Sequence, residues 1–188
     1  YQGKGTRQQI AKETKKIALK ERLEFDQLSP RQIYRLQKKN QLGIDCSALA
    51  FHLANFYHLL RFGRPITPYL IGTGGKKGVR RLSASILTSP QNSLPVSSYP
   101  FQPADLIRLD RGHHVAFILD SNPDQITYIH SSRKTLIRGV HLATIAISNP
   151  SLPLNEQLWS EKTITNKPYS SLFYPQKGDG VFRLKVFT

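Results

Sequence analysis

The spacing of apolar residues changes from helical to alternating along the chain. Apolar residues recur at helical intervals in the first part, and from residue 105 onward they follow the pattern of strands separated by turns. The strand-like runs are DLIRL, HVAFIL, QITYIH, TLIRGVHLATIAI and VFRLKVF. Helices followed by a series of short strands predict an α+β fold with an antiparallel sheet.

The first apolar stripe comprises Ile10, Ile17 and Leu19 among many Lys, Arg, Glu and Gln residues. This distribution predicts an amphipathic helix. We therefore assign residues 1–28 to a basic amphipathic helix or extension and residues 29–188 to the main domain. The extension either packs one narrow stripe on a core or binds a polyanion.

The clearest predicted helix begins at Asp45 and Cys46 and ends near Gly63. Apolar residues recur at helical spacing after the cysteine, at Leu49, Leu53, Phe56 and Leu60. Asp45 is a suitable N-cap, which places Cys46 in the first turn, where the helix N-terminus lowers the pKa of a thiol. Taken alone, Cys46 is either a small core residue or a nucleophile.

Composition and charge narrow the possibilities only in part. The 188 residues are 39% hydrophobic, which is typical of a globular chain. A single cysteine excludes an intramolecular disulfide framework, and no apolar stretch is long enough to span a bilayer. The chain begins at Tyr1 and contains no Met, so we expect a processed or truncated form. A net charge of +15 favours polyanionic partners without choosing among nucleic acid, anionic lipid and acidic wall polymers.

A histidine pair is predicted in the hairpin HVAFILDSNPDQITYIH. If residues 120–124 form its loop, Leu119 lies opposite Gln125, and His114 lies opposite His130 on the same face of the sheet. One imidazole can then hold the other in a single tautomer. The alternative is a half-buried polar pair without a catalytic role. Two histidines with no strong third ligand do not make a zinc site, so no metal site is predicted.

The remaining histidines are assigned structural positions. His52 and His58 are six residues apart on the cysteine helix and do not share a face, and His113 points away from His114. His141 lies in a later predicted strand. Residues 63–104 are rich in Gly, Pro and Ser, contain no phosphate-binding loop, and suggest a groove wall or lid.

Four segments in this order resemble the NlpC-type cell-wall cysteine peptidases, a papain-like group of amidohydrolases. The segments are YRLQKKNQLGIDCSAL, PADLIRL, HVAFIL and YIHSS, and they extend over about residues 30–147. Tyr34 precedes Cys46 by the spacing of the family motif. The resemblance implies a papain-like NlpC-type fold, in which a nucleophile helix packs on an antiparallel sheet, with the N-terminal helix added to it.

The resemblance also implies the residue roles. Cys46 would be the nucleophile, His114 the general base and then general acid, and His130 the residue that orients His114. Positions matching the family's substrate subsite are Tyr34, Asp45 and Ser47. No cofactor is implied.

The implied reaction is hydrolysis of amide bonds in bacterial peptidoglycan stem peptides through an acyl-enzyme. The basic surface would hold the enzyme to anionic wall polymers in an extracellular or periplasmic location, with no nucleic-acid partner. Two alternatives stay open: the same fold acting as a deamidase, transglutaminase or acyltransferase on protein or lipid, or a non-catalytic polyanion-binding module.

Some positions depart from the family pattern. The glycine pair of the tyrosine motif is replaced by Gln37 and Lys38, and two further glycines by Ala48 and Ala104. These changes affect the substrate subsite more than the catalytic residues. The basic loop 72–81 either reshapes the groove or is simply solvated.

Overall fold

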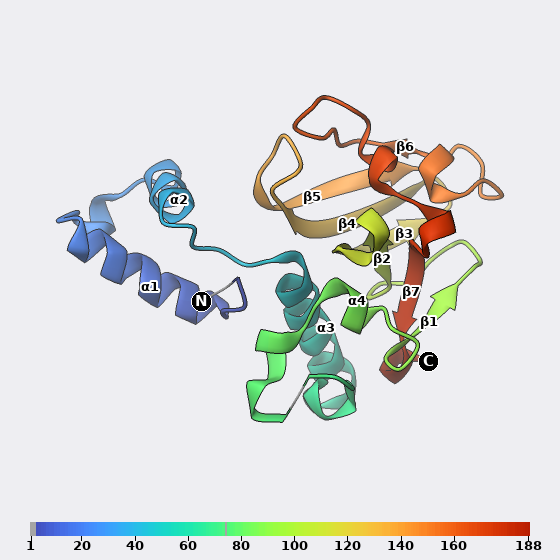
Figure 1. Cartoon of the computed structure of the whole chain (residues 1–188), viewed down its shortest axis with the longest axis horizontal. Coiled ribbons are helices and arrows are strands. Elements are labelled where there is room, and N and C mark those ends of the chain that lie inside the picture. Colours follow the sequence, from blue (N-terminus) through green and yellow to red (C-terminus); the bar gives the residue numbers. More distant parts are fainter. Residues whose placement is uncertain (1–2, 74) are drawn as a thin grey trace. The chain divides into compact units, whose positions relative to one another are not determined.

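The computed structural model describes residues 3–73 and 75–188, except for the side chains of 75–77 (Figure 1). The chain divides into two compact units, Tyr1–Asp45 and Cys46–Thr188. The predicted α+β class is confirmed, because helices come first and a seven-stranded antiparallel sheet follows. Among the described residues, no helix has the length and apolar character needed to cross a membrane.

Two helices, α1 (Arg7–Lys20) and α2 (Pro30–Lys39), make up most of the first unit. Each begins with a capping box at Thr6 or Ser29. The cap hydroxyl accepts a hydrogen bond from a backbone N–H, and a glutamine three residues later accepts one from the N–H of the cap. These local contacts fix the residues at which both helices begin.

The buried face of α1 differs from the predicted stripe. Thr14 and Ala18 are buried, whereas Leu19 is 79% exposed. Thr14 accepts a hydrogen bond from the side-chain amide of Gln37 on α2, at 2.9 Å. The helix is therefore confirmed, with Ile10 and Ile17 of the predicted stripe partly buried and Leu19 exposed.

The cysteine helix, α3 (Cys46–Phe62), begins where the sequence predicts and is followed by Gly63 in a left-handed conformation. It packs on the sheet through small residues, including Ala50 and Ala54. Phe56 and Leu60, which belong to the apolar repeat, are 60% and 71% exposed. Small side chains let the helix axis approach the sheet closely, so the buried face lies beside the stripe of large residues.

Seven strands form one antiparallel sheet in the order β1-β7-β2-β3-β4-β5-β6. Five of them correspond to the predicted runs, whereas β1 and β6 lie in segments rich in turn residues and were not predicted. The predicted long loop 63–104 also contains a short helix, α4 (Ala84–Leu87). The strands are β1 (Ser93–Val96), β2 (Leu106–Leu109), β3 (His114–Asn122), β4 (Gln125–Ser132), β5 (Gly139–Ala146), β6 (Leu158–Trp159) and β7 (Gly180–Leu184).

Both faces of the sheet are covered by apolar side chains. Val115 and Phe117 of β3 belong to the core shared with α3. Their neighbours Ala116 and Ile118 belong to a second core with Tyr169. Because side chains alternate along a strand, His114 shares its face with Ala116 and the second core. His114, the first residue of β3, therefore lies at the edge of this second core.

Candidate active site

Cys46 is the first residue of α3 and packs, partly buried, against the core beneath that helix. The N-terminus of a 17-residue helix favours a negative charge, such as that of a thiolate. The next residue, Ser47, is buried, and its hydroxyl donates to the carbonyl of Leu82 at 3.1 Å. Ser47 therefore anchors a neighbouring loop, whereas the sequence analysis places it in a substrate subsite.

A β-bulge in the hairpin of β3 and β4 decides where His114 points. At the tip Asn122 pairs with Gln125, and beyond the bulge Ile118 pairs with Tyr128, so Leu119 is an extra residue. The predicted register, with Leu119 opposite Gln125, is therefore wrong. The side-chain oxygen of Asn122 accepts two backbone N–H groups and shortens the loop to two residues.

The bulge at Leu119 returns His114 to the face of the sheet on which the predicted register placed it. Without the extra residue, the register at the tip would place His114 and His130 on opposite faces, because side chains alternate with a period of two. With Leu119 bulged, the two histidines return to one face as diagonal neighbours. The predicted contact on one face is confirmed, with His114 Nε2 and His130 Nδ1 2.8 Å apart, but the two residues are not directly opposite one another.

The carboxylate of Asp179 fixes the turn before His114 through hydrogen bonds. This carboxylate accepts the backbone N–H groups of Arg111 and Gly112, at 2.9 and 3.0 Å, and that of Tyr174, at 3.0 Å. Its side chain is fully buried. A buried acceptor with three donors fixes the loop conformation and therefore the point where β3 begins.

His114 is neutral near physiological pH. Burial, together with the nearby His130, lowers the pKa of His114 to about 3. The His114 ring also makes an edge contact with Tyr169, at 6.4 Å between centroids. Burial raises the pKa of the Tyr169 hydroxyl above its usual range, and a charged Cys46 adds to this effect. Tyr169 is thus a ring neighbour of His114 and lies within electrostatic range of Cys46.

His141 and Glu161 complete the cluster, and neither was predicted as a site residue. Glu161 Oε1 lies 2.5 Å from His141 Nε2 and 3.1 Å from His130 Nε2. The hydroxyl of Tyr128 donates to the other oxygen of Glu161. His141 is paired directly with His130 across β4 and β5, a signal available from the strand pattern. Glu161 follows β6 in an irregular segment, so no periodic pattern marks it.

Glu161 sets the direction of the hydrogen bonds. Burial alone would raise the pKa of Glu161, but hydrogen bonds from His130, Tyr128 and His141 bring it to about 2. The ionised carboxylate can only accept, so His130 donates from Nε2 and accepts at Nδ1 from His114 Nε2. The free lone pair of His114 is then at Nδ1, which is the form that a general base requires.

The other predicted subsite residues belong to the first unit. Asp45 accepts a hydrogen bond from Lys4 at 2.9 Å, and its N–H donates to the carbonyl of Gly3 at 2.8 Å. Tyr34 lies on α2 and is 44% exposed. In the basic loop 72–81, residue 74 and the side chains of 75–77, including Lys76 and Lys77, lie outside the described residues.

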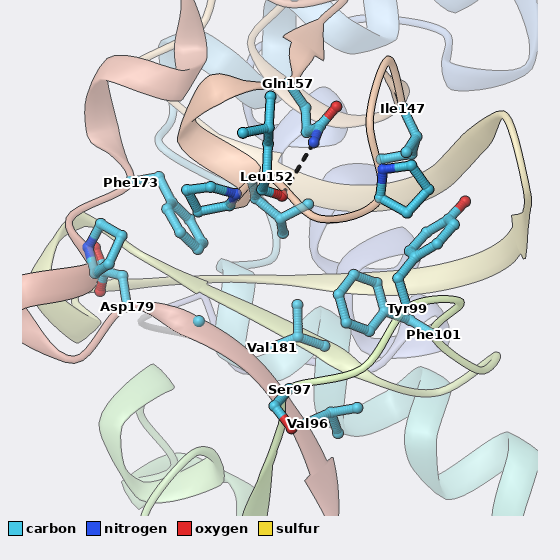
Figure 2. A pocket seen from close by; sticks show the side chains of 15 residues that line it. Val96, Ser97, Tyr99, Phe101, Ile147, Leu152, Gln157, Phe173, Asp179 and Val181 are labelled. Carbon is cyan, nitrogen blue, oxygen red and sulfur yellow. Dashed lines mark hydrogen bonds between the residues drawn. The ribbon is translucent and has the colours of Figure 1, made fainter.

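A separate pocket of about 230 Å³ lies elsewhere in the second unit (Figure 2). Figure 2 shows Tyr99 and Phe101 on one side and Leu152 and Phe173 on another, which makes the walls mainly apolar. Neither the cysteine nor any histidine is among the residues that line it. This pocket is therefore distinct from the cysteine–histidine cluster.

No family model, curated protein or solved structure matches this chain. Its functional assignment therefore depends on the motifs and on the geometry of the cluster.

Proposed function

We propose that this protein is a cysteine amidohydrolase of papain-like NlpC type, with Cys46 as nucleophile, His114 as base and His130 as the orienting residue. The observation that carries the proposal is the partly buried hydrogen bond between His114 and His130, beside Tyr169, whose hydroxyl lies within electrostatic range of Cys46. A nucleophile at a helix N-terminus, a neutral base and an orienting partner are the parts that thiol catalysis requires.

The reaction would proceed in two steps. His114 Nδ1 takes the proton of the Cys46 thiol, and the thiolate attacks the amide carbonyl to form a tetrahedral intermediate. The C–N bond then breaks, the leaving amine receives the proton from His114, and an acyl-thioester remains on Cys46. Water, deprotonated by His114, hydrolyses this thioester and restores the thiol.

His130 and Glu161 support this cycle without touching the substrate. When His114 becomes charged, its Nε2–H still donates to His130 Nδ1, and His130 in turn donates to the carboxylate of Glu161. The negative charge of Glu161 stabilises the positive imidazolium through this chain. Glu161 is therefore a positioning residue in the proposal.

The proposed substrates are peptidoglycan stem peptides, outside the cytoplasm or in the periplasm. This choice follows the motif resemblance, and the net charge of +15 suits binding to anionic wall polymers. Digestion of purified peptidoglycan by the native chain and by Cys46→Ala, with fragments identified by mass spectrometry, tests the substrate class. Absence of Cys46-dependent fragments across several stem-peptide types would direct the search to protein or lipid acyl groups.

The reactivity of the thiol tests the catalytic assignment itself. Iodoacetamide should alkylate Cys46 at neutral pH faster than it alkylates free cysteine, and His114→Gln should abolish this advantage. His113→Gln is the matched control, because His113 is the adjacent histidine and is exposed. A rate equal to that of free cysteine, or equal losses in both variants, would contradict the proposal and favour a non-catalytic polyanion-binding module.

A further inference from the structure

Three metal-ligating atoms converge beside the proposed catalytic pair. His130 Nε2 and His141 Nε2 are 3.0 Å apart, and Glu161 Oε1 lies 3.1 and 2.5 Å from them, respectively. The atoms come from β4, from β5 and from the segment after β6. Their side chains are almost completely buried, at 0%, 8% and 9% exposure. Three segments distant in sequence are therefore needed to assemble this group.

The spacing of the three atoms suits a small cation. A point about 2.05 Å from each atom, the usual length of zinc–nitrogen and zinc–oxygen bonds, lies about 1.2 Å from the plane of the three atoms. The atoms need to separate by a few tenths of an ångström to reach tetrahedral angles around an ion at that point. Two imidazoles and one carboxylate form the ligand set of many zinc sites with an open fourth position. Mg²⁺ and Ca²⁺ prefer oxygen ligands and fit this set poorly.

Each ligand is also oriented by an outer partner, as metal ligands usually are. In the metal-bound form, His141 Nδ1 donates to the carbonyl of Gly139, 3.0 Å away, and Nε2 presents a lone pair to the ion in place of the proton that it shares with Glu161. Tyr128 donates to the second oxygen of Glu161. His130 Nδ1 is bonded to His114. This outer shell holds the ligand atoms in place before any ion arrives.

We propose that His130, His141 and Glu161 form a binding site for a divalent transition-metal ion of the zinc class. The site goes beyond the proposed hydrolase, which requires no metal, and its existence does not depend on that activity. The three atoms are drawn together within the protein interior, where groups of this kind occur mainly as metal ligands or as hydrogen-bonded networks. Metal binding distinguishes the two.

Occupancy of the site would oppose the thiol base, a consequence that rests on the proposed function. A metal on His130 Nε2 moves the proton of that ring to Nδ1, which then donates to His114 Nε2. Neutral His114 must then carry its own proton on Nδ1. This atom can no longer accept the proton of the Cys46 thiol. The metal therefore reverses the hydrogen-bond direction set by Glu161 and inhibits Cys46.

The first experiment measures binding alone. The Cys46→Ala variant, which lacks the thiol ligand, is stripped with a chelator and titrated with Co²⁺ in the visible range and with Zn²⁺ by calorimetry. We expect one ion per chain and no binding of Mg²⁺. Adding His141→Gln or Glu161→Gln should weaken binding more than about 100-fold, since even outer-shell changes cost about 10–100-fold. Adding His113→Gln, the exposed control, should change nothing.

Absence of binding at millimolar metal, or equal affinity with and without His141→Gln, would overturn the proposed site. Circular dichroism of each variant verifies folding, and the two ligand substitutions check each other if one is unstable. This experiment does not use Cys46, so its failure leaves the hydrolase proposal intact.

The second experiment measures the consequence. Zn²⁺ should slow alkylation of Cys46 in the native chain but not in His141→Gln, which keeps the His114–His130 pair and lacks one ligand. Equal inhibition in both chains would mean that Zn²⁺ binds the thiolate directly, which overturns the inhibitory role of the site. If Cys46 is unreactive without metal, the hydrolase proposal fails while the binding result stands.

Discussion

Replacing Glu161 with glutamine tests whether its charge holds the buried cluster together. The substitution keeps the shape of the side chain but removes the charge from three hydrogen bonds, made by Tyr128, His130 and His141. Hydrogen bonds to charged groups contribute about 1.5–3 kcal/mol and neutral ones about 0.5–1.5 kcal/mol. Loss of about 1 kcal/mol from each bond predicts a decrease of about 3 kcal/mol in the free energy of unfolding.

The lowered pKa of Glu161, which arises from the same hydrogen bonds, gives a similar magnitude. Its fall from 4.5 to about 2 corresponds to about 3–4 kcal/mol, at about 1.4 kcal/mol for each unit of pKa. Because the pKa is lowered in the folded chain, this stability is fully present above pH 4.5 and is lost as the pH falls toward 2. The difference in the free energy of unfolding between the native chain and Glu161→Gln should therefore disappear as the pH falls from 4.5 to about 2.

Urea unfolding measures the effect through the fluorescence of Trp159, the single tryptophan of the chain. Its ring lies 5.6 Å from that of Tyr128, so it reports on this part of the second unit. Chelator is included to keep metal ions out. The matched control is Glu156→Gln, five positions earlier in the chain, where the side chain is exposed and a change below about 0.5 kcal/mol is expected. A loss below about 1 kcal/mol for Glu161→Gln at pH 7, or a difference that persists to pH 2, would refute this account.

Two further substitutions test the contacts that hold the strands carrying the site. Asp179→Ala leaves three backbone N–H groups without their acceptor and should cost about 3 kcal/mol in urea unfolding, at about 1 kcal/mol for each group, because only the hydrogen bond of Gly112 is fully buried. Exposed Asp120→Ala should cost less than about 0.5 kcal/mol. Arg183→Met removes the two-bond partner of Asp105, which is 1% exposed, and should cost about 3–5 kcal/mol. Exposed Arg133→Met is its control, and equal effects of the two arginine substitutions would contradict the role of the ion pair.

The start of α3 and most strands could be predicted because their signals are local. The apolar repeat begins directly after Cys46, and the strands show their burial by alternation over a few positions. The buried faces of the helices were predicted less well. Leu19 and Leu60 are exposed because contact with a neighbouring element favours small residues at the closest approach, and residue spacing does not identify that element.

The sequence by itself determined the α+β class and the position of Cys46 at a helix start, and it identified His114 and His130 as candidate partners. Only the tertiary structure decided how these parts meet. The bulge at Leu119 sets which face His114 occupies, and Glu161 reaches His130 across 31 positions from an irregular segment. Strand register and long-range packing depend on contacts between segments distant in sequence, and no periodic pattern in one segment records them.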